Sequence, residues 1–415
     1  MPDHVSCPDS IIVVVCCHVL VLAMLEWHLR RVQTVLDMQD HLKEAYLTYL
    51  LGKRKRNTRF NRAFLSRLRS NFDDVLAIGD DSVYVSLFMV TRHTFHEILL
   101  PPFRAEYNSR AVRRRVRGSD RNAAKFVRLD MRNMSAKMTL ALVLSHLVGN
   151  PDTRMRQLVH AQCEETLTRY LKFGVECLNA AWCRIPSSRV SLPTLGEMQY
   201  LSSLVERRVG GADGGVLNGT FGFIDGSMHT AQKPTCSFKE REYYNGYYGC
   251  NGFKAVYLVA ADGTIRWAKL CPGTAYDNTV YESLALELHD RIPHTLPYKI
   301  LGDSAFSITR VLVRPYTSRE IAAHPGRDAE IRSHNKKISS IRIAAEWGMR
   351  DIKRFSMFDS KLSIEHKDLS EAYWEAAIHL HNVVARLTNI NQTRNVFMRG
   401  EANAEILREV ESVFH

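Results

Sequence analysis

The sequence lacks the cysteine patterns that mark secreted or zinc-finger proteins. Its nine cysteines form no Cys-x-x-Cys pair and no regular spacing, so neither a disulfide framework nor a standard zinc finger is predicted. An odd number of such cysteines favours a reducing compartment, the cytosol or the nucleus. The best zinc candidates are His160, Cys163, Cys177 and Cys183, but buried helical cysteines explain their spacing better.

The sequence also has no apolar run of full membrane-spanning length. The longest run, residues 11–25, falls short of the roughly 20 residues that a transmembrane helix needs. As a signal peptide it lacks a basic n-region, because Asp3 and Asp9 precede it, and no Ala-x-Ala-like cleavage site follows. We therefore predict a packed helix within an N-terminal segment, residues 1–57, and expect no membrane association. A membrane-tethered variant is the alternative.

Acidic residues are too few to balance the basic ones. The 44 Asp and Glu residues stand against 56 Lys and Arg, which gives a net charge of +12 and favours a polyanionic partner. The basic cluster at residues 53–56 predicts nuclear import or phosphate contact, or else a solvated turn. A second run, residues 110–121, predicts a mobile loop along a DNA backbone or a merely solvated loop; its candidate DNA contacts are Arg113, Arg114 and Arg115.

Residues 58–185 are predicted to be a helical, DNA-binding region. Ser135 can cap a helix that Gly149-Asn150-Pro151 ends, and further helices are expected over residues 153–160 and 164–178. Short helices joined by tight turns are typical of a helix-turn-helix, and equally of a small helical bundle. In the first case the exposed residues of the third helix are expected to be Thr166, Arg169 and Lys172.

Prolines and glycines over residues 186–215 predict a linker, and strand-like segments follow it. An Asp-Gly turn at Asp262-Gly263 predicts a hairpin, and a helix is expected from Asp277 to about residue 291. The expected strands are residues 221–224, 253–260, 264–270 and 298–301. This order predicts an α/β domain over residues 216–395, a mixed sheet flanked by helices, with a C-terminal tail over 396–415.

Three carboxylates stand at the edges of apolar segments in this domain. Asp225 in Gly-Phe-Ile-Asp-Gly-Ser and Asp303 in Leu-Gly-Asp-Ser-Ala-Phe each follow a short strand, so we expect them at neighbouring strand ends. Glu346 lies in the helical segment Arg-Ile-Ala-Ala-Glu-Trp-Gly. Carboxylates gathered in this way can hold hard divalent cations, which act on phosphate esters. The leading substrate is therefore a nucleic-acid phosphodiester.

Cations flank Glu346 on the predicted helix. At 100° per residue, Arg342 and Lys353 fall within about 20° of Glu346, where they can hold the phosphates beside a scissile bond. Arg350, with Arg342, could instead form ordinary intrahelical ion pairs with Glu346. We count Arg350 and Arg169 as further candidate DNA contacts. Phe223 excludes the aspartate-nucleophile phosphatases, which need an aspartate two residues before the first acid.

The segment from about Phe223 to residue 389 resembles the DDE endonuclease domain of PIF/Harbinger-type transposases. Besides the acids, the likeness rests on Tyr243-Tyr244-Asn245-Gly246, Phe253-Lys254-Ala255-Val256, Pro272-Gly273-Thr274-Ala275-Tyr276-Asp277, Arg314-Pro315-Tyr316 and Asn335-Lys336-Lys337. The sequence departs from the family at His229, which stands displaced from the usual histidine position, at Tyr276 before Asp277, and at Trp347-Gly348-Met349.

The resemblance implies an RNase H-like fold in which Asp225, Asp303 and Glu346 bind metal. It also implies cleavage and transfer of DNA strands, a separate Myb/SANT-like partner and a nuclear location, with the cytoplasm as a second location. We expect a homo-oligomer on DNA and a two-metal mechanism with Mg²⁺, for which Mn²⁺ substitutes, and with Asp225 bridging both ions. A catalytically inactive, transposase-derived DNA-binding protein is the alternative.

Overall fold

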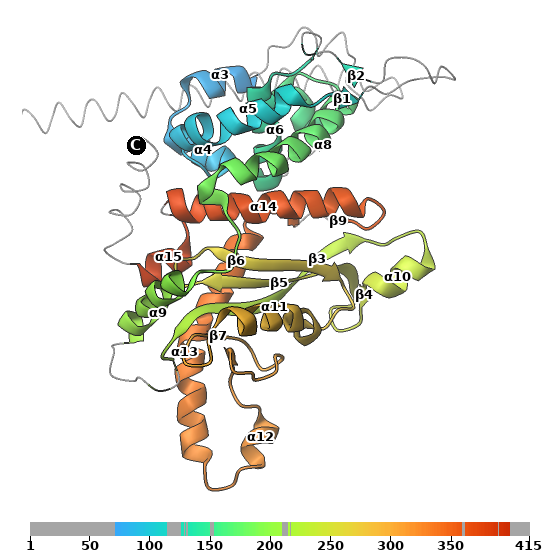
Figure 1. Cartoon of the computed structure of the whole chain (residues 1–415). Helices are drawn as coiled ribbons and strands as arrows, with labels where there is room; N and C mark the ends of the chain where they lie inside the picture. The colour runs from blue at the N-terminus through green and yellow to red at the C-terminus, as the bar shows by residue number, and fades with distance from the viewer. Residues whose placement is uncertain are drawn as a thin grey trace, which may run out of the picture. The chain divides into compact units, whose positions relative to one another are not determined.

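The structure is a computed structural model that describes residues 71–113, 126–127, 129, 132–149, 153–209, 215, 217–358, 362–388 and 390–398 (Figure 1). The chain divides into two compact units, Met1–Arg67 and Leu68–His415, and every described residue belongs to the second. The predicted helix at residues 11–25, the basic cluster at 53–56 and the tail beyond residue 398 lie outside the described residues.

The described chain before residue 190 is mainly helical, as predicted. Ser135 caps α6, since its Oγ accepts the Met138 N–H at 3.2 Å. Gly174 of α8 packs so closely on α6 that a Cβ there would lie 2.6 Å from Val143. The helices are α3 (Asn71–Ile78), α4 (Asp81–Phe88), the π-helix η1 (Thr94–Leu99), α5 (Leu100–Ser109), α6 (Ala136–Gly149), α7 (Thr153–His160), α8 (Glu164–Ala181), η3 (Trp182–Arg184) and η4 (Pro186–Ser188).

Helices α6, α7 and α8 begin and end close to their predicted positions, but α8 is more buried than expected. Thr166, which was predicted to be exposed, is buried, and its Oγ1 lies 3.1 Å from the Cys163 Sγ. Arg169 is half-buried and Lys172 is exposed. The prediction for Thr166 was wrong because the apolar face of α8 packs on two sides, against α5 and α6 and against α14 (Lys367–Leu387). The DNA-reading role of this segment stays a prediction.

A two-stranded ribbon begins in the basic run at residues 110–121 and ends beyond it. β1 (Val112–Arg113) pairs antiparallel with β2 (Phe126–Val127). The backbone of Arg113 is therefore in a strand, whereas the predicted DNA contacts Arg114 and Arg115 lie outside the described residues.

A mixed sheet follows, flanked by helices as predicted. Its central strand order is β4-β5-β3-β7-β8, with β6 paired to β5 and β9 paired to β3. β5 is antiparallel to β3 and β6, whereas β7 is parallel to β3 and β8. The strands are β3 (Thr220–Gln232), β4 (Tyr244–Asn245), β5 (Cys250–Ala260), β6 (Ile265–Pro272), β7 (Lys299–Leu301), β8 (Leu312–Val313) and β9 (Leu362–Ser363).

Helices cover both faces of this sheet. Along β5, Tyr257 and Val259 face α14 and α13, because Trp374 Nε1–H donates to the Tyr257 hydroxyl and Gly348 packs on the Val259 side chain. Lys254 points to the opposite face, where it pairs with the first residue of α11. Figure 1 shows α14 and α11 on opposite sides of the sheet. The remaining helices are α9 (Leu195–Val209), α10 (Ser237–Tyr243), α11 (Asp277–Arg291), α12 (Ser318–Ala322), α13 (Asp328–Lys353), η5 (Ser356–Phe358) and α15 (Gln392–Phe397).

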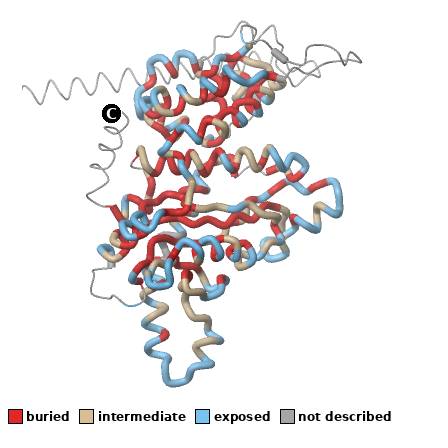
Figure 2. Tube along the Cα trace, viewed as in Figure 1, coloured by how far each residue is buried: buried red, intermediate tan, exposed pale blue. Residues whose placement is uncertain are grey.

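β5 is buried along most of its length because both of its faces are covered, which suits its nearly continuous apolar sequence. Figure 2 shows buried residues throughout the sheet, the helices packed on it and the helical region before residue 190, whereas α12 and the first turns of α13 are largely exposed. None of the described helices combines the length and apolarity that crossing a membrane requires.

The predicted Asp-Gly hairpin is confirmed as β5 and β6. Gly263 has a φ of 79°, a conformation that glycine adopts without strain, and its N–H bonds the Ala260 carbonyl at 2.9 Å. The predicted linker at residues 186–215 contains helix α9, which packs on β3. An ion-pair network joins α9 to the hairpin, because the buried Arg266 contacts Glu197 at 2.9 Å and Asp262 at 2.8 Å.

Removing Asp262 is expected to destabilise the fold strongly. The Arg266 side chain is only 8% exposed, so Asp262→Ala leaves a buried guanidinium without its main partner. We expect a loss of about 3–5 kcal/mol in the free energy of unfolding, measured by urea denaturation. Glu371→Ala, which breaks an exposed pair with Lys367, is the control and should cost less than about 1 kcal/mol. Equal losses in the two variants contradict this account.

The same pair makes a prediction for pH. Burial raises the pKa of Asp262, but Arg266 and the Thr264 hydrogen bonds outweigh burial and lower the pKa to about 2. A lowered carboxyl pKa stabilises the folded state above the unfolded pKa of about 3.9, and this stabilisation disappears as the pH falls toward 2. Asp262→Asn should therefore flatten the fall in stability between pH 4 and about 2. If the pair were unimportant, urea denaturation would show the same fall in the free energy of unfolding with pH in Asp262→Asn as in wild type.

Candidate active site

Asp225 lies inside β3, not at its end. β3 continues to Gln232, so the prediction that the strand ends at Asp225 was wrong. The residue is half-buried, pairs across the sheet with Tyr257 of β5, and accepts the Gly226 N–H on Oδ1 at 2.8 Å. The strand continues because Ser227, His229 and Ala231 remain buried beyond the acid.

Strand register brings Asp303 next to Asp225. Phe223 pairs with Leu301 in the parallel β3–β7 ladder, and each aspartate lies two residues further along its strand. Gly302 still donates its N–H to the Val313 carbonyl at 3.0 Å, so the chain keeps the strand direction up to Asp303. Adjacent strands are about 4.8 Å apart and side chains alternate faces with a period of two, so both carboxylates leave the same face of neighbouring chains.

The sheet opens at this pair of acids. β7 pairs with β3 only as far as Phe223, and β9 pairs with β3 from Ala231 onward. Among the described strands, none pairs with residues 224–230 of β3 on this edge. After Asp303 the chain turns, and the Asp303 Oδ1 accepts the Ala305 N–H at 2.9 Å. The two carboxylates therefore stand where the sheet splits, half-buried and each oriented by a backbone N–H.

Glu346 lies on α13, which covers the same face of the sheet. A Cβ on Gly348 would lie 2.9 Å from Val259, and Val259 pairs with Phe223 two residues before Asp225. Because Phe223 and Asp225 share one face, α13 crosses the sheet on the side from which Asp225 points. Glu346 is exposed on the flank of this helix, as the sequence pattern predicts.

Two residues on the flank of Glu346 show which way it faces. Asn335 exchanges hydrogen bonds with the backbone of Tyr316, which follows β8, at 2.8 and 2.9 Å. Lys353, at the other end of the helix, lies near enough to His229 of β3 to act on its pKa. Both Asn335 and Lys353 lie within about 20° of Glu346 around the helix. The flank therefore faces the C-terminal ends of β3 and β8, the end of the sheet where Asp303 also lies.

The three acids are nevertheless not gathered into one tight cluster. Within the described residues, no group of three or more His, Cys, Asp or Glu side chains is arranged to hold a metal ion. The structure thus brings Asp225 and Asp303 together through strand register and turns the flank of Glu346 toward them. It does not place the third carboxylate within the same set of ligands.

A buried ion pair supports the strand behind Asp225. Lys254 Nζ lies 2.9 Å from Asp277 Oδ2, and the Asp277 carboxylate fills the space where Gly226 would carry a side chain. Asn278 accepts the N–H of Ser307, in the loop after Asp303, at 2.8 Å. The first two residues of α11 therefore contact both acid-bearing segments. Lys254 and Asp277 belong to two of the sequence motifs named above, but their pairing across the sheet is non-local and has no signal in the sequence.

A buried chain of hydrogen-bonded side chains lies beside Asp225, on the face of the sheet opposite to the Lys254–Asp277 pair. The Tyr257 hydroxyl accepts Trp374 Nε1–H and bonds His229 Nε2, both at 2.8 Å. Burial, with a smaller effect of the Lys353 charge, lowers the pKa of His229 to about 3. His229 is therefore a neutral, enclosed side chain at physiological pH and not an exposed ligand, and it helps to hold β3 and β5 in place beneath α14.

The predicted DNA contacts are distributed unevenly over the structure. Arg350 and Lys353 are exposed in the last turns of α13, the helix of Glu346. Arg342 belongs to the same helix, but its side chain lies outside the described part of the structure. Arg169 lies on α8 in the helical region. Two of the seven candidates, Arg350 and Lys353, are thus exposed on the same helix as Glu346.

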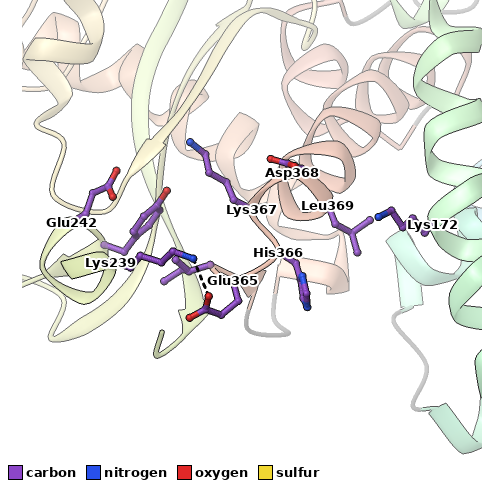
Figure 3. A pocket seen from close by; sticks show the side chains of 10 residues that line it. Lys172, Lys239, Glu242, Glu365, His366, Lys367, Asp368 and Leu369 are labelled. Atoms are coloured by element: carbon purple, nitrogen blue, oxygen red, sulfur yellow. Dashed lines mark hydrogen bonds and ion pairs between the residues drawn. The ribbon is translucent and has the colours of Figure 1, made fainter. Parts of the chain in front are cut away.

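A pocket of about 370 Å³ lies between α8, α10 and the start of α14 (Figure 3). Its charges are mixed, and the Lys239–Glu365 pair at 2.8 Å occupies one wall. The pocket does not include any of the three predicted acids; its lining is Lys172, Lys239, Glu242, Tyr243, Ile364, Glu365, His366, Lys367, Asp368 and Leu369.

Comparison with known proteins bears on the segment that carries the acids. A family model described as DDE superfamily endonuclease matches residues 224–382, a range that contains Asp225, Asp303 and Glu346. No curated protein and no solved structure gives a significant match. The family match supports the DDE endonuclease superfamily for this segment and indicates a transposase-like nuclease. It does not distinguish Harbinger-type enzymes from other members.

The contact between Gly226 and Asp277 predicts a specific mutational coupling. A Cβ at position 226 would lie 2.3 Å from Asp277 Oδ1, so Gly226→Ala should displace the carboxylate and destabilise the protein by about 1–3 kcal/mol. In an Asp277→Ala background the same substitution should cost much less, because the clash is gone. Thermal unfolding of the single and double variants measures this coupling.

Gly196→Ala is the matched control for this experiment. Gly196 lies in α9 with nothing within 4 Å of its Cβ position, so the added methyl group should not lower stability. An additive double variant at positions 226 and 277 would show that the two residues do not touch.

Proposed function

We propose that this protein is a divalent-metal-dependent DNA endonuclease of the transposase type, with Asp225, Asp303 and Glu346 as its catalytic carboxylates. One observation carries the proposal. The β3–β7 register sets two acidic residues side by side at an open edge of the sheet, inside the segment that matches the endonuclease family. We further propose an RNase H-like fold and a Harbinger-type enzyme, on the strength of the motifs that run through residues 243–348.

The donor chemistry fits a hard divalent cation such as Mg²⁺ or Mn²⁺. All three proposed ligands are carboxylates, and Asp225 and Asp303 are paired by register and half-buried. Asp225 and Asp303 would hold the ions together with Glu346, which would approach from the facing flank of α13. The bound ions would supply an activated water nucleophile and charge stabilisation at the leaving 3′ oxygen.

The chain itself orients the proposed ligands and the DNA backbone. The Gly226 and Ala305 N–H groups each hold one oxygen of an aspartate, which restricts the rotation of both side chains. Arg314 donates two hydrogen bonds to the Glu320 carboxylate, at 2.9 and 2.8 Å, and these bonds raise the pKa of Arg314, with a smaller contribution from the charge of Asp303. Arg314 is therefore a fixed cation that interacts with the Asp303 charge. Arg350 and Lys353 contact phosphates and position the duplex without reading its sequence.

We also propose that the protein works in the nucleus as a homo-oligomer on DNA with a Myb/SANT-like partner. The basic net charge and the family resemblance support these points. The alternative, a DNA-binding protein without activity, differs from the proposal only in the chemistry of the acids, so a cleavage assay separates the two.

Asp225→Asn and Asp303→Asn are each expected to reduce Mg²⁺-dependent nicking of DNA by more than about 100-fold, because each removes a charged metal ligand. DNA binding should persist in both variants. Supercoiled plasmid relaxation measures nicking, and a gel shift measures binding. Asp290→Asn, which changes an exposed acid at the far end of α11, is the control and should nick normally.

The outcomes separate the candidate functions. Undiminished nicking by either variant would falsify the assignment of that acid. A wild-type protein that binds DNA without nicking it in Mg²⁺ or Mn²⁺ would favour the inactive DNA-binding protein instead.

Lys353→Ala is expected to weaken DNA binding uniformly across sequences. If Lys353 neutralises one phosphate, the slope of log affinity against log salt should become shallower by about 1. Arg327→Ala, at the residue just before the same helix, is the control, since Glu330 already neutralises Arg327 through contacts at 2.9 and 3.0 Å. Fluorescence anisotropy at several salt concentrations measures both slopes. Equal slopes for wild type and Lys353→Ala would exclude a phosphate contact.

A further inference from the structure

We propose that a group of exposed tyrosines, in the turn before β5 and at the start of α11, stacks on unpaired bases of DNA bound at the candidate active site. The group, which we call the tyrosine surface, consists of Tyr247, Tyr248 and Tyr276. This inference rests on the proposed function, because it assumes that a DNA strand reaches Asp225 and Asp303. Tyr247 and Tyr248 directly follow the motif Tyr243-Tyr244-Asn245-Gly246, and Tyr276 lies in the motif at residues 272–277. The catalytic scheme assigns no role to these three tyrosines.

The tyrosine surface is unusual for its exposure. The side chains of Tyr247 and Tyr276 are 90% and 78% exposed, so neither ring contributes to the folded core. Tyr248 lies beside Tyr247 with ring centroids 5.0 Å apart in an edge-to-face arrangement. Exposed aromatic side chains gathered in this way mark a binding surface more often than isolated ones do.

The two loops that carry these rings are locked together. Asn245 accepts the N–H groups of Tyr247 and Tyr248 on Oδ1, and its Nδ2 donates to the Gly273 carbonyl at 2.6 Å. Gly273 also approaches the neighbouring backbone so closely that a Cβ would lie 2.4 Å from the Tyr243 carbonyl oxygen. The rings therefore project from a rigid support, and ordering them costs little when a ligand binds.

A short series of contacts connects this surface to the acids. The ammonium of Lys254 lies 5.8 Å from the centre of the Tyr248 ring and 2.9 Å from Asp277 Oδ2. Asp277 follows Tyr276 in sequence and touches Gly226, the residue after Asp225. The tyrosine surface is thus continuous with the support of β3 on the face of the sheet where α11 lies, opposite to the face from which the Asp225 side chain points.

The chemistry of the surface favours unpaired bases over other ligands. In a duplex the faces of the bases are already stacked, so only unpaired bases offer a face to a tyrosine ring. The net charge of +12 favours a polyanionic strand as the partner. A strand cleaved at Asp225 and Asp303 has nucleotides beside the cut that can separate from the complementary strand.

The test compares a DNA duplex with the same duplex extended by a tail of unpaired thymidines. Binding is measured by anisotropy with the full chain in EDTA, so that the result does not depend on cleavage. We expect wild type to prefer the tailed duplex, and Tyr247→Ala combined with Tyr276→Ala to lose about 5- to 100-fold of that preference. The phenylalanine versions of both residues should keep it, because stacking needs the ring and not the hydroxyl.

Tyr200→Ala is the matched control, since Tyr200 is a partly exposed tyrosine on α9. Thermal melting confirms that each variant is folded. Equal affinity of wild type for the two duplexes, or an unchanged preference in the alanine variant, would overturn the proposal. So would an altered oligomeric state of the alanine variant with unchanged tail binding, which would make the surface a protein interface. The assay needs no nicking, so it tests the tyrosine surface independently of the catalytic acids. The tyrosine proposal can therefore fail while the catalytic assignment holds, and the catalytic assignment can fail while the tyrosine proposal holds.

Discussion

The parallel pairing of β3 with β7 is the interaction on which the candidate site depends. It continues only to Phe223 and Leu301, and both chains carry an aspartate two residues later. A shift of one residue in either strand would turn one carboxylate to the opposite face, where α11 lies. The buried apolar side chains on both strands, among them Phe221, Phe223 and Ile300, oppose such a shift because it would expose them. The buried side chains of β3 and β7 thus fix the position of Asp225 relative to Asp303.

The support behind β3 restricts the same position from the other face. Lys254 and Asp277 form an ion pair whose side chains are 9% and 19% exposed, and the carboxylate lies against Gly226. Burying charges is unfavourable unless they are paired, so the pair fixes the distance between α11 and the sheet. Gly226 needs its small size here because of Asp277, not because of its backbone conformation. The strand is therefore held by the Tyr257 chain on one face and by an ion pair on the other.

Local patterns predicted most of the elements in the sheet domain. The Asp-Gly turn gave the β5–β6 hairpin, and the apolar runs gave β5, β6 and β7. The errors arose where tertiary contacts override local sequence. β3 extends beyond Asp225 because β5 pairs with it as far as Thr230, and Thr166 is buried because α8 packs on two sides. The side-by-side placement of Asp225 and Asp303 needed strand register, which a single sequence does not contain.

The position of Glu346 shows the same limit most clearly. Helical periodicity correctly predicted which side of α13 carries Glu346, but the direction in which that side faces depends on the contacts at each end of the helix. Asn335 holds the first half of the helix to Tyr316. Near the other end, the buried Asp351 accepts the Gln392 N–H at 3.0 Å, and Arg354 donates to the Ile390 carbonyl at 3.0 Å. These attachments lie far apart in sequence, yet together they determine how closely the third carboxylate can approach the other two. The position of Glu346 is therefore governed by α13, whereas strand register fixes the positions of Asp225 and Asp303.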